Sequence, residues 1–212
     1  MTPPAVPPLD DFAAMAVLAD LLSGRGDPRG ELVQLQLERE QRPFDVRLAK
    51  AEAAHLARHD RALLGPLRTA TSLCELTWRR GYIVEARLKS YAQDHADRFT
   101  GQRVVIEPKR TRLARLVREL LALESARPLA MLTVQLPYSS FARPHLLACV
   151  DEVLVASPSS LRVLGVHVLE QRYGDDWYSA DWHVAATLEQ RVGDLHVSAD
   201  AAFAPQVFSR LA

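Results

Sequence analysis

The chain has 212 residues, of which 48% are hydrophobic and 25% are charged, so it can bury a sizeable core and is too apolar for extended disorder. Its 26 basic and 26 acidic side chains leave no net charge, which excludes the basic surplus of a dedicated nucleic-acid binder. No apolar stretch approaches the roughly 20 residues of a membrane-spanning helix. We therefore expect a globular protein whose partners include neither membrane nor nucleic acid.

The cysteine count bears on the compartment of the protein, and the composition of residues 1–9 bears on whether they are ordered. Two cysteines are too few for a disulfide framework, which indicates a reducing compartment and predicts a cytoplasmic protein. Residues 1–9 contain no basic residue and no apolar run of signal-peptide length. They are rich in proline, so we expect a disordered, extended lead before the first helix.

Three helices are predicted within a module at residues 10–66, each from apolar residues that recur at steps of three and four. The start and stop signals are Asp10 or Asp11 and Gly24 for the first helix, Asp27-Pro28 and Gln41 for the second, and Pro43 and Gly65-Pro66 for the third.

Residues 67–212 change to short strand-like runs separated by helical stretches. Four segments share the spacing Leu-x-x-Leu-x-Val or a close variant, and they start at Leu73, Leu129, Leu161 and Val192. In a leucine-rich repeat this spacing marks a strand, and a helix returns the chain to the next parallel strand. Helical periodicity at 110–123 and 144–150 supplies such returns, and 82–88 and 103–106 are also strand-like.

The fold class that follows is α/β: an N-terminal helical module followed by leucine-rich-repeat-like β/α units with a mainly parallel sheet. The spacing is permissive, because a leucine-rich α/β protein without repeats also meets it by chance.

Two stretches also carry a resemblance. Residues 19–36, ADLLSGRGDPRGELVQLQ, resemble the bacterial repeat-companion domain, and residues 78–85, WRRGYIVE, look like the strand-turn-strand that often follows it. The resemblance covers roughly the first 90 residues. The chain departs from the family at Leu21, where Trp is usual, and at Ser23-Gly24, where acidic residues are common. The resemblance implies leucine-rich-repeat-like segments after the module and implies no activity.

The candidate catalytic and metal constellations are weak. His55 and His59 lie four residues apart with Glu52 one turn earlier, but the pattern is not HExxH, and we interpret it as a solvated helical face. Cys149 and His145 are also four residues apart, but no third group orients a base onto the thiol. We therefore expect no catalytic residue, no cofactor and no metal.

A basic stripe on the predicted helix at 110–123 could attract phosphate or an acidic protein surface. Its members are Lys109, Arg110, Arg112, Arg115 and Arg118. The same pattern is typical of an ordinary amphipathic helix, which is the interpretation we favour.

The densest aromatic cluster, mixed with aspartates, lies at residues 173–182. The candidate partner-binding residues are Trp177, Tyr178, Trp182, Tyr173 and Asp176. Such side chains are frequent at interface hot spots, but they could equally cap the open end of a repeat stack. We expect a surface loop here, with Trp177 as an exposed anchor and Trp182 buried.

Together these patterns favour a non-catalytic adaptor or scaffold that presents a repeat-like sheet and its loops to another protein. Two alternatives stay open: a toxin-neutralising immunity or inhibitor protein with one tight partner, and an enzyme whose site is assembled from residues distant in sequence. The identity of the partner and the oligomeric state do not follow from the sequence.

Overall fold

The computed structural model describes residues 4–89, 112–137, 142–173, 180–184 and 186–212. Its helical elements are α1 (Phe12–Gly24), α2 (Arg29–Gln41), α3 (Val46–Arg58), α4 (Asp60–Leu64), η1 (Gly65–Leu73), α5 (Arg112–Leu121), η2 (Glu124–Ala126), α6 (Ala142–Ala156) and α7 (Ala204–Leu211). Its strands are β1 (Cys74–Arg79), β2 (Tyr82–Lys89), β3 (Met131–Pro137), β4 (Val163–Tyr173), β5 (Ala180–Val184), β6 (Thr187–Val192) and β7 (Leu195–Asp200). None of these helices combines the length and apolarity that a membrane crossing requires.

The strands form one seven-stranded sheet in the order β1-β2-β3-β4-β7-β6, and β5 pairs with β4 beside this path. The four central strands, β2, β3, β4 and β7, run parallel. Strands β1, β5 and β6 each pair antiparallel with a neighbour. The expected α/β class, with N-terminal helices before a mainly parallel sheet, is therefore confirmed.

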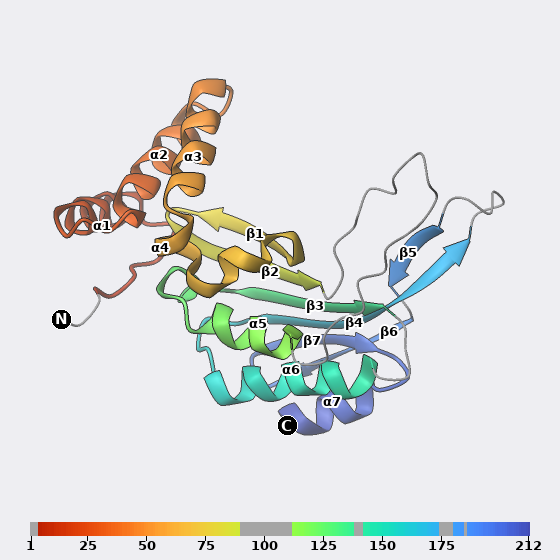
Figure 1. The fold of residues 1–212 in the computed structure, drawn as a ribbon. Helices are drawn as coiled ribbons and strands as arrows, with labels where there is room; N and C mark the ends of the chain where they lie inside the picture. The colour runs from red at the N-terminus through yellow and green to blue at the C-terminus, as the bar shows by residue number, and fades with distance from the viewer. Residues whose placement is uncertain (1–3, 90–111, 138–141, 174–179, 185) are drawn as a thin grey trace.

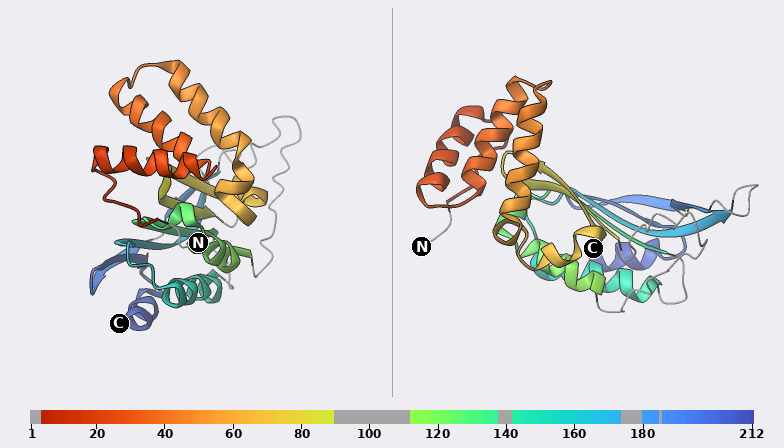
Figure 2. Two further views of the ribbon diagram at one scale, coloured as in Figure 1. Left: turned by 90° about the vertical axis from the view of Figure 1, so that its left-hand side faces the viewer. Right: turned by 45° about the horizontal axis from the view of Figure 1, so that its top comes forward.

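Helices α5, α6 and α7 lie together on one face of this sheet (Figure 1). Helix α5 precedes β3 and α6 links β3 to β4, so the chain steps across the sheet in one direction. Because parallel crossovers are right-handed, successive steps in one direction place their helices on the same face. No described helix lies along the opposite face, as the second view of Figure 2 shows.

The main core lies between this helical layer and the sheet. Leu113, Leu116, Val117 and Leu120 of α5 are all buried, so the sequence pattern of an amphipathic helix is confirmed. They pack with residues from the covered face of the strands and with Phe203, which is fully buried before α7.

The N-terminal helices have a smaller core of their own. It contains Met15, Leu18, Ala19 and Leu22 of α1, Val33 and Leu37 of α2, and Tyr82 of β2. Asp11 caps α1 as predicted, because its carboxylate accepts a hydrogen bond of 2.9 Å from the amide of Ala14. Tyr82 is thus the first residue of β2 and also a core residue of the module.

The turn between β1 and β2 presses against α2. Arg80 and Gly81 both have positive φ, 49° and 79°, as a two-residue hairpin turn requires. A Cβ on Gly81 would lie 2.6 Å from Cγ2 of Val33 and 3.0 Å from the carbonyl oxygen of Arg29. Only glycine therefore fits this position, because both the backbone conformation and the space exclude a side chain.

Polar groups fix the same turn from both sides. The amide of Gly81 donates to Oε1 of Gln36 at 2.7 Å, and Nε2 of Gln36 donates to Glu52 at 2.6 Å. The guanidinium of Arg80 pairs with Glu40 and donates to the carbonyl of Leu9. Gln36, Glu52 and Arg80 are buried, so their hydrogen bonds satisfy groups that would otherwise be costly to bury.

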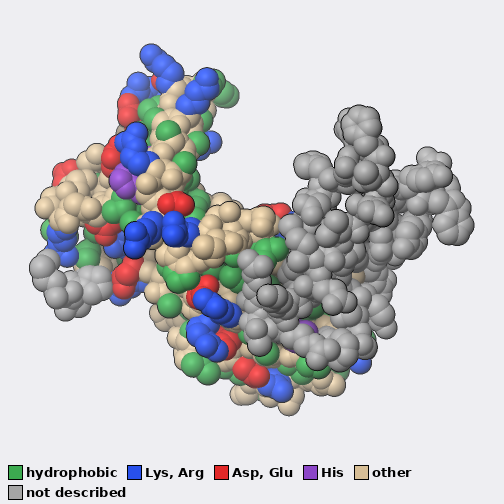
Figure 3. Space-filling view, in the orientation of Figure 1, with side chains coloured by type: hydrophobic (Ala, Val, Ile, Leu, Met, Phe, Trp, Pro, Cys, Tyr) green, Lys and Arg blue, Asp and Glu red, His purple; other side chains and the backbone are tan. Residues whose placement is uncertain are grey.

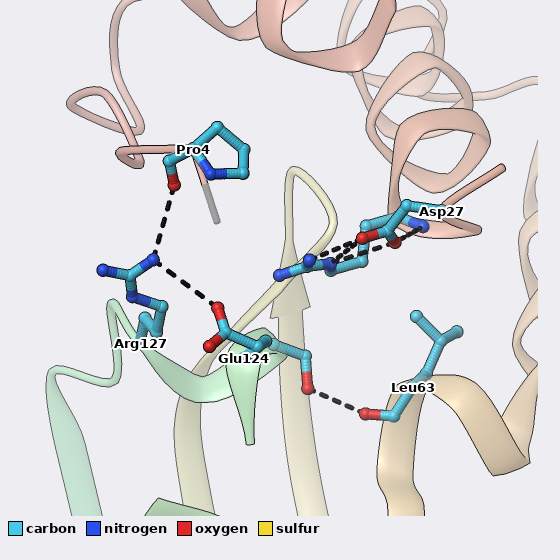
Figure 4. A network of polar contacts seen from close by, with 7 residues as sticks. Pro4, Asp27, Leu63, Glu124 and Arg127 are labelled. Atoms are coloured by element: carbon cyan, nitrogen blue, oxygen red, sulfur yellow. Dashed lines mark hydrogen bonds and ion pairs between the residues drawn. The ribbon is translucent and has the colours of Figure 1, made fainter. Parts of the chain in front are cut away.

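A second set of contacts joins the module to η2 and to the residues before α1 (Figure 4). Ser125 donates to the carbonyl oxygen of Leu63 at 2.7 Å, and Arg127 donates to that of Pro4 at 3.4 Å. Asp27 and Arg29 pair beside them. Where the sequence predicts a disordered lead at residues 1–9, residues 4–9 thus make defined contacts, and Val6 and Leu9 pack on the small core.

Of the four segments with the repeat-like spacing, two form neighbouring parallel strands at equivalent positions. Leu132 of β3 pairs in register with Leu164 of β4, and both are fully buried. The first segment is not equivalent, because the Arg80-Gly81 turn makes β1 antiparallel to β2. The fourth segment crosses a hairpin turn at Gly193, so Val197 and not Leu195 lies opposite Leu164.

Replacing Gly81 with alanine should destabilise the protein by about 3 kcal/mol or more, since left-handed strain of roughly 1–2 kcal/mol adds to overpacking of roughly 1–3 kcal/mol. The matched control is Gly193→Ala, which has φ of 59° but nothing within 4 Å of its Cβ. That variant should lose only the strain. Urea unfolding of both variants measures the difference, and equal losses would show that the turn does not dock on α2.

Candidate functional site

Polar residues alternate along the strands on the face that the helices leave uncovered. On β2 they are Glu85, Arg87 and Lys89, on β3 Thr133 and Gln135, on β4 His167, and on β7 His196, Ser198 and Asp200. A parallel sheet is usually covered on both faces and is then apolar on both. The alternation here therefore marks a surface that is built to face polar groups, and we call it the open face.

Glu75, Arg87 and Lys89 form a charged group at the β1 side of the open face. Glu75 accepts hydrogen bonds from Nζ of Lys89 and, at 3.2 Å, from Arg87. The Lys89 hydrogen bond, together with the charges of Lys89 and Arg87, holds the pKa of the Glu75 carboxyl below its usual range despite partial burial. Both cations are therefore partly neutralised where they reach the sheet.

Burial on the open face increases toward the carboxyl ends of β2 and β3, from exposed Glu85 and Met131 to partly buried Lys89 and buried Gln135. Lys89, Gln135 and His167 are adjacent in register across these three strands. Gln135 is 8% exposed, and so is Asp200, which follows the register partner of Val166 in β7. The row lies on the face of the sheet itself, since β3 continues to Pro137 and β4 to Tyr173.

His167 lies at the β4 end of this row, against Gly165 and Thr133. A Cβ on Gly165 would come within 2.8 Å of Nε2 of His167 and 3.2 Å of the Thr133 side chain. Glycine at 165 therefore makes the space that the imidazole occupies. Nδ1 of His167 is buried and has no hydrogen-bond partner among the described residues.

Burial, reinforced by the positive charge of Arg87, lowers the pKa of His167, although Asp200 and Glu189 oppose that shift. The ring is consequently neutral near pH 7, with one nitrogen that donates and one that accepts. An unsatisfied buried nitrogen of this kind can accept a hydrogen bond from a ligand or a partner, or take a proton.

A separate cavity of about 280 Å³ lies where α2 and α3 meet β1. It is lined by Gln36, Arg39, Glu40, Pro43, Glu52, Trp78, Arg79 and Arg80. Its carboxylates are already paired, Glu40 with Arg80 and Glu52 with Gln36 and Arg39. We assign these groups to the docking of the β1–β2 turn and not to ligand binding.

The aromatic segment at residues 173–182 is described only in part. Tyr173 ends β4 opposite Ala180, and Trp182 lies in β5 opposite Gln171, so the segment includes the paired strands of a hairpin and is not only the predicted loop. Asp176, Trp177 and Tyr178 lie outside the described residues. The assignment of Trp177 as the exposed anchor and Trp182 as the buried residue stays a prediction.

The prediction that Glu52, His55 and His59 form a solvated helical face is wrong for Glu52 and His55, whereas His59 is partly buried. His55 is 2% and Glu52 7% exposed, because α3 packs its polar residues against α2 and the β1–β2 turn. Glu52 is bound to Gln36 and Arg39 and does not approach the histidines as a third ligand. The acidic side chain near them is Glu31, from α2.

The remaining candidates from the sequence are the Cys149 thiol and the basic stripe on α5. Burial raises the pKa of the Cys149 thiol to about 12, so almost no thiolate exists near neutral pH. In the basic stripe, Arg115 pairs with Glu119 and Arg118 with Glu152, as on an ordinary amphipathic helix. Lys109 and Arg110 lie outside the described residues.

The row of Lys89, Gln135 and His167 was not predicted from the sequence. The three residues are distant in sequence and become neighbours only through parallel pairing. The sequence contained a weak signal for this row, because polar residues alternate in Glu85-x-Arg87-x-Lys89 and in Thr133-x-Gln135. Such alternation indicates strands with one polar face, whereas a strand covered on both faces is apolar throughout.

Comparisons with family models, with curated proteins and with solved structures found no match to this chain. The function therefore rests on the geometry of the open face and on the sequence.

The lowered pKa of His167 gives a prediction with a defined sign. The unfolded chain, with a histidine pKa of about 6.5, takes up its proton first, so the free energy of unfolding should fall as the pH drops below about 6.5. The loss levels off below the folded pKa. His167→Asn should remove this component, as urea unfolding at several pH values would show, and a ring titration by NMR at or above 6.5 would contradict the burial.

Proposed function

We propose that this protein is a non-catalytic adaptor or scaffold that receives another protein on the open face of its sheet and on the adjoining loops. One observation carries the proposal: the helices cover a single face of the central parallel strands, and the other face presents rows of polar side chains. Its cytoplasmic location belongs to the proposal, and it is supported by the cysteine count, since two cysteines are too few for a disulfide framework.

The character of the open face favours a protein partner. Cationic and anionic groups alternate on it, as in Glu75 beside Arg87 and Lys89. Basic and acidic side chains are likewise interspersed on the side of the molecule shown in Figure 3. Nucleic acid would need a continuous basic surface, whereas a protein partner is matched by both signs of charge.

The open face is more buried around Gln135 than elsewhere, and this part can determine which partner fits. Met131, which is 37% exposed, lies on the same face as the buried Gln135 and the partly buried His167. Interfaces commonly combine a buried centre that fixes orientation with a solvated rim. The unpartnered Nδ1 of His167 can donate a hydrogen bond to the partner or accept one from it, depending on the tautomer.

The resemblance to the repeat-companion domain supports the same role, because such modules precede leucine-rich-repeat-like segments, and repeat sheets are binding surfaces. An immunity or inhibitor protein would use the same face with a single high-affinity partner. A catalytic role has one observation in its favour, the neutral imidazole of His167, which could act as a general base.

A bulky charge placed on the open face should block the partner. We expect Met131→Arg to weaken binding by more than about 2 kcal/mol, roughly 30-fold, because Met131 lies on the open face of β3 between Glu85 and Val163. Ala122→Arg is the matched control, since Ala122 is exposed at the end of α5 on the helical side. Partners are captured by pull-down with mass spectrometry and then titrated as purified proteins. Equal binding by both variants would contradict the proposed face.

The aromatic segment is tested separately. Trp177→Ala should weaken binding of the same partner by more than about 2 kcal/mol without lowering the melting temperature, as expected of an exposed anchor. Trp182→Ala should lower the melting temperature and leave the affinity of the folded protein unchanged. Affinity that neither substitution alters would remove the segment from the binding surface.

A further inference from the structure

Three possible metal ligands from two helices converge at the α2–α3 contact, apart from the open face. Glu31 of α2, His55 in the last turn of α3 and His59 immediately after α3 place one donor atom each within 4.8 Å of the others. His55 is 2% exposed, whereas Glu31 is exposed and His59 is partly buried. The cluster therefore has a buried base and access from solvent.

The hydrogen bonding of His55 settles where its proton lies. Nε2 of His55 is 2.8 Å from the carbonyl oxygen of Pro28. A carbonyl can only accept, so Nε2 carries the hydrogen and donates it. In the neutral ring Nδ1 then has a lone pair, and it has no hydrogen-bond partner among the described residues.

That lone pair faces an anion. Nδ1 of His55 lies 3.3 Å from Oε2 of Glu31, and the rings of His55 and His59 are 4.5 Å apart between centroids. Two acceptor atoms with no hydrogen between them leave a buried nitrogen unsatisfied, which is costly. A cation between them removes this cost.

The spacing and the donor types fit a zinc-like ion. Bonds of about 2.0–2.2 Å at tetrahedral angles separate two ligand atoms by about 3.3 Å. Two imidazoles and one carboxylate are a donor set of zinc sites that keep a fourth position open, whereas calcium and magnesium prefer oxygen donors alone. The Pro28 carbonyl bound to Nε2 is the outer contact that orients a metal-binding histidine.

We propose that Glu31, His55 and His59 bind one divalent transition-metal ion of the zinc class, with a fourth position open to solvent. The ion would connect α2 to the junction of α3 and α4. The site is independent of the proposed partner-binding face, because none of its three ligands lies on the sheet.

The first test measures metal binding by the purified full chain. Zinc is titrated in competition with a chromogenic chelator, and Co²⁺ is added as a spectroscopic probe of the ligands. We expect one ion per chain, an absorption spectrum typical of four-coordinate Co²⁺, and a melting temperature that rises with zinc concentration. No binding at a stoichiometry of one, with stability unaffected by zinc, would overturn the proposal and leave a proton as the cation between His55 and Glu31.

The second test assigns the ligands. Glu31→Gln, His59→Asn and His55→Asn should each weaken zinc binding at least about tenfold. Loss of a group that only contacts a metal ligand already weakens binding by about this factor, and loss of a ligand should cost no less. Glu38→Gln on α2 and His145→Asn on α6 are the matched controls and should keep full affinity. If His55→Asn does not fold, the two substitutions nearer the surface decide, and unchanged affinity in both would overturn the assignment.

Discussion

The docking of the Arg80-Gly81 turn onto α2 is the contact on which the arrangement of the molecule depends. The turn fixes β1 and β2 as an antiparallel pair, and its close approach to Val33 holds the module against the edge of the sheet. Gln36 accepts a hydrogen bond from the Gly81 amide and donates one to Glu52, so this side chain links the turn to α3. A change in the turn therefore alters the module and the first two strands at once.

The same helix organises the proposed metal site. Gln36 faces the turn and Glu31 faces His55, so α2 contacts the sheet and α3 with different residues of one rigid element. Burial of Glu52 and His55 against α2 requires polar partners, and each has one in Gln36 or in the Pro28 carbonyl. Within this contact, Nδ1 of His55 has no hydrogen-bond partner among the described residues, and a bound cation would satisfy it.

The open face follows from the direction in which the strands are connected. Right-handed crossovers from β2 to β3 and from β3 to β4 place α5 and α6 on one side, so the other side needs no apolar partner. Polar residues can then occupy every second strand position without being buried under a helix. The burial of Gln135 and Asp200, on either side of the partly buried His167, distinguishes one part of this surface from the exposed remainder.

The sequence by itself determined the elements whose signals are local: the Asp11 cap, the apolar stripe of α5 and the equivalence of Leu132 with Leu164. It did not determine the antiparallel edges or the residues that meet across elements. Spacing within a segment reports which residues face a core, but it contains no information about which distant segment lies opposite. Parallel register brought Gln135 beside His167, and helix packing brought Glu31 to His55, so only the tertiary structure decided both candidate sites.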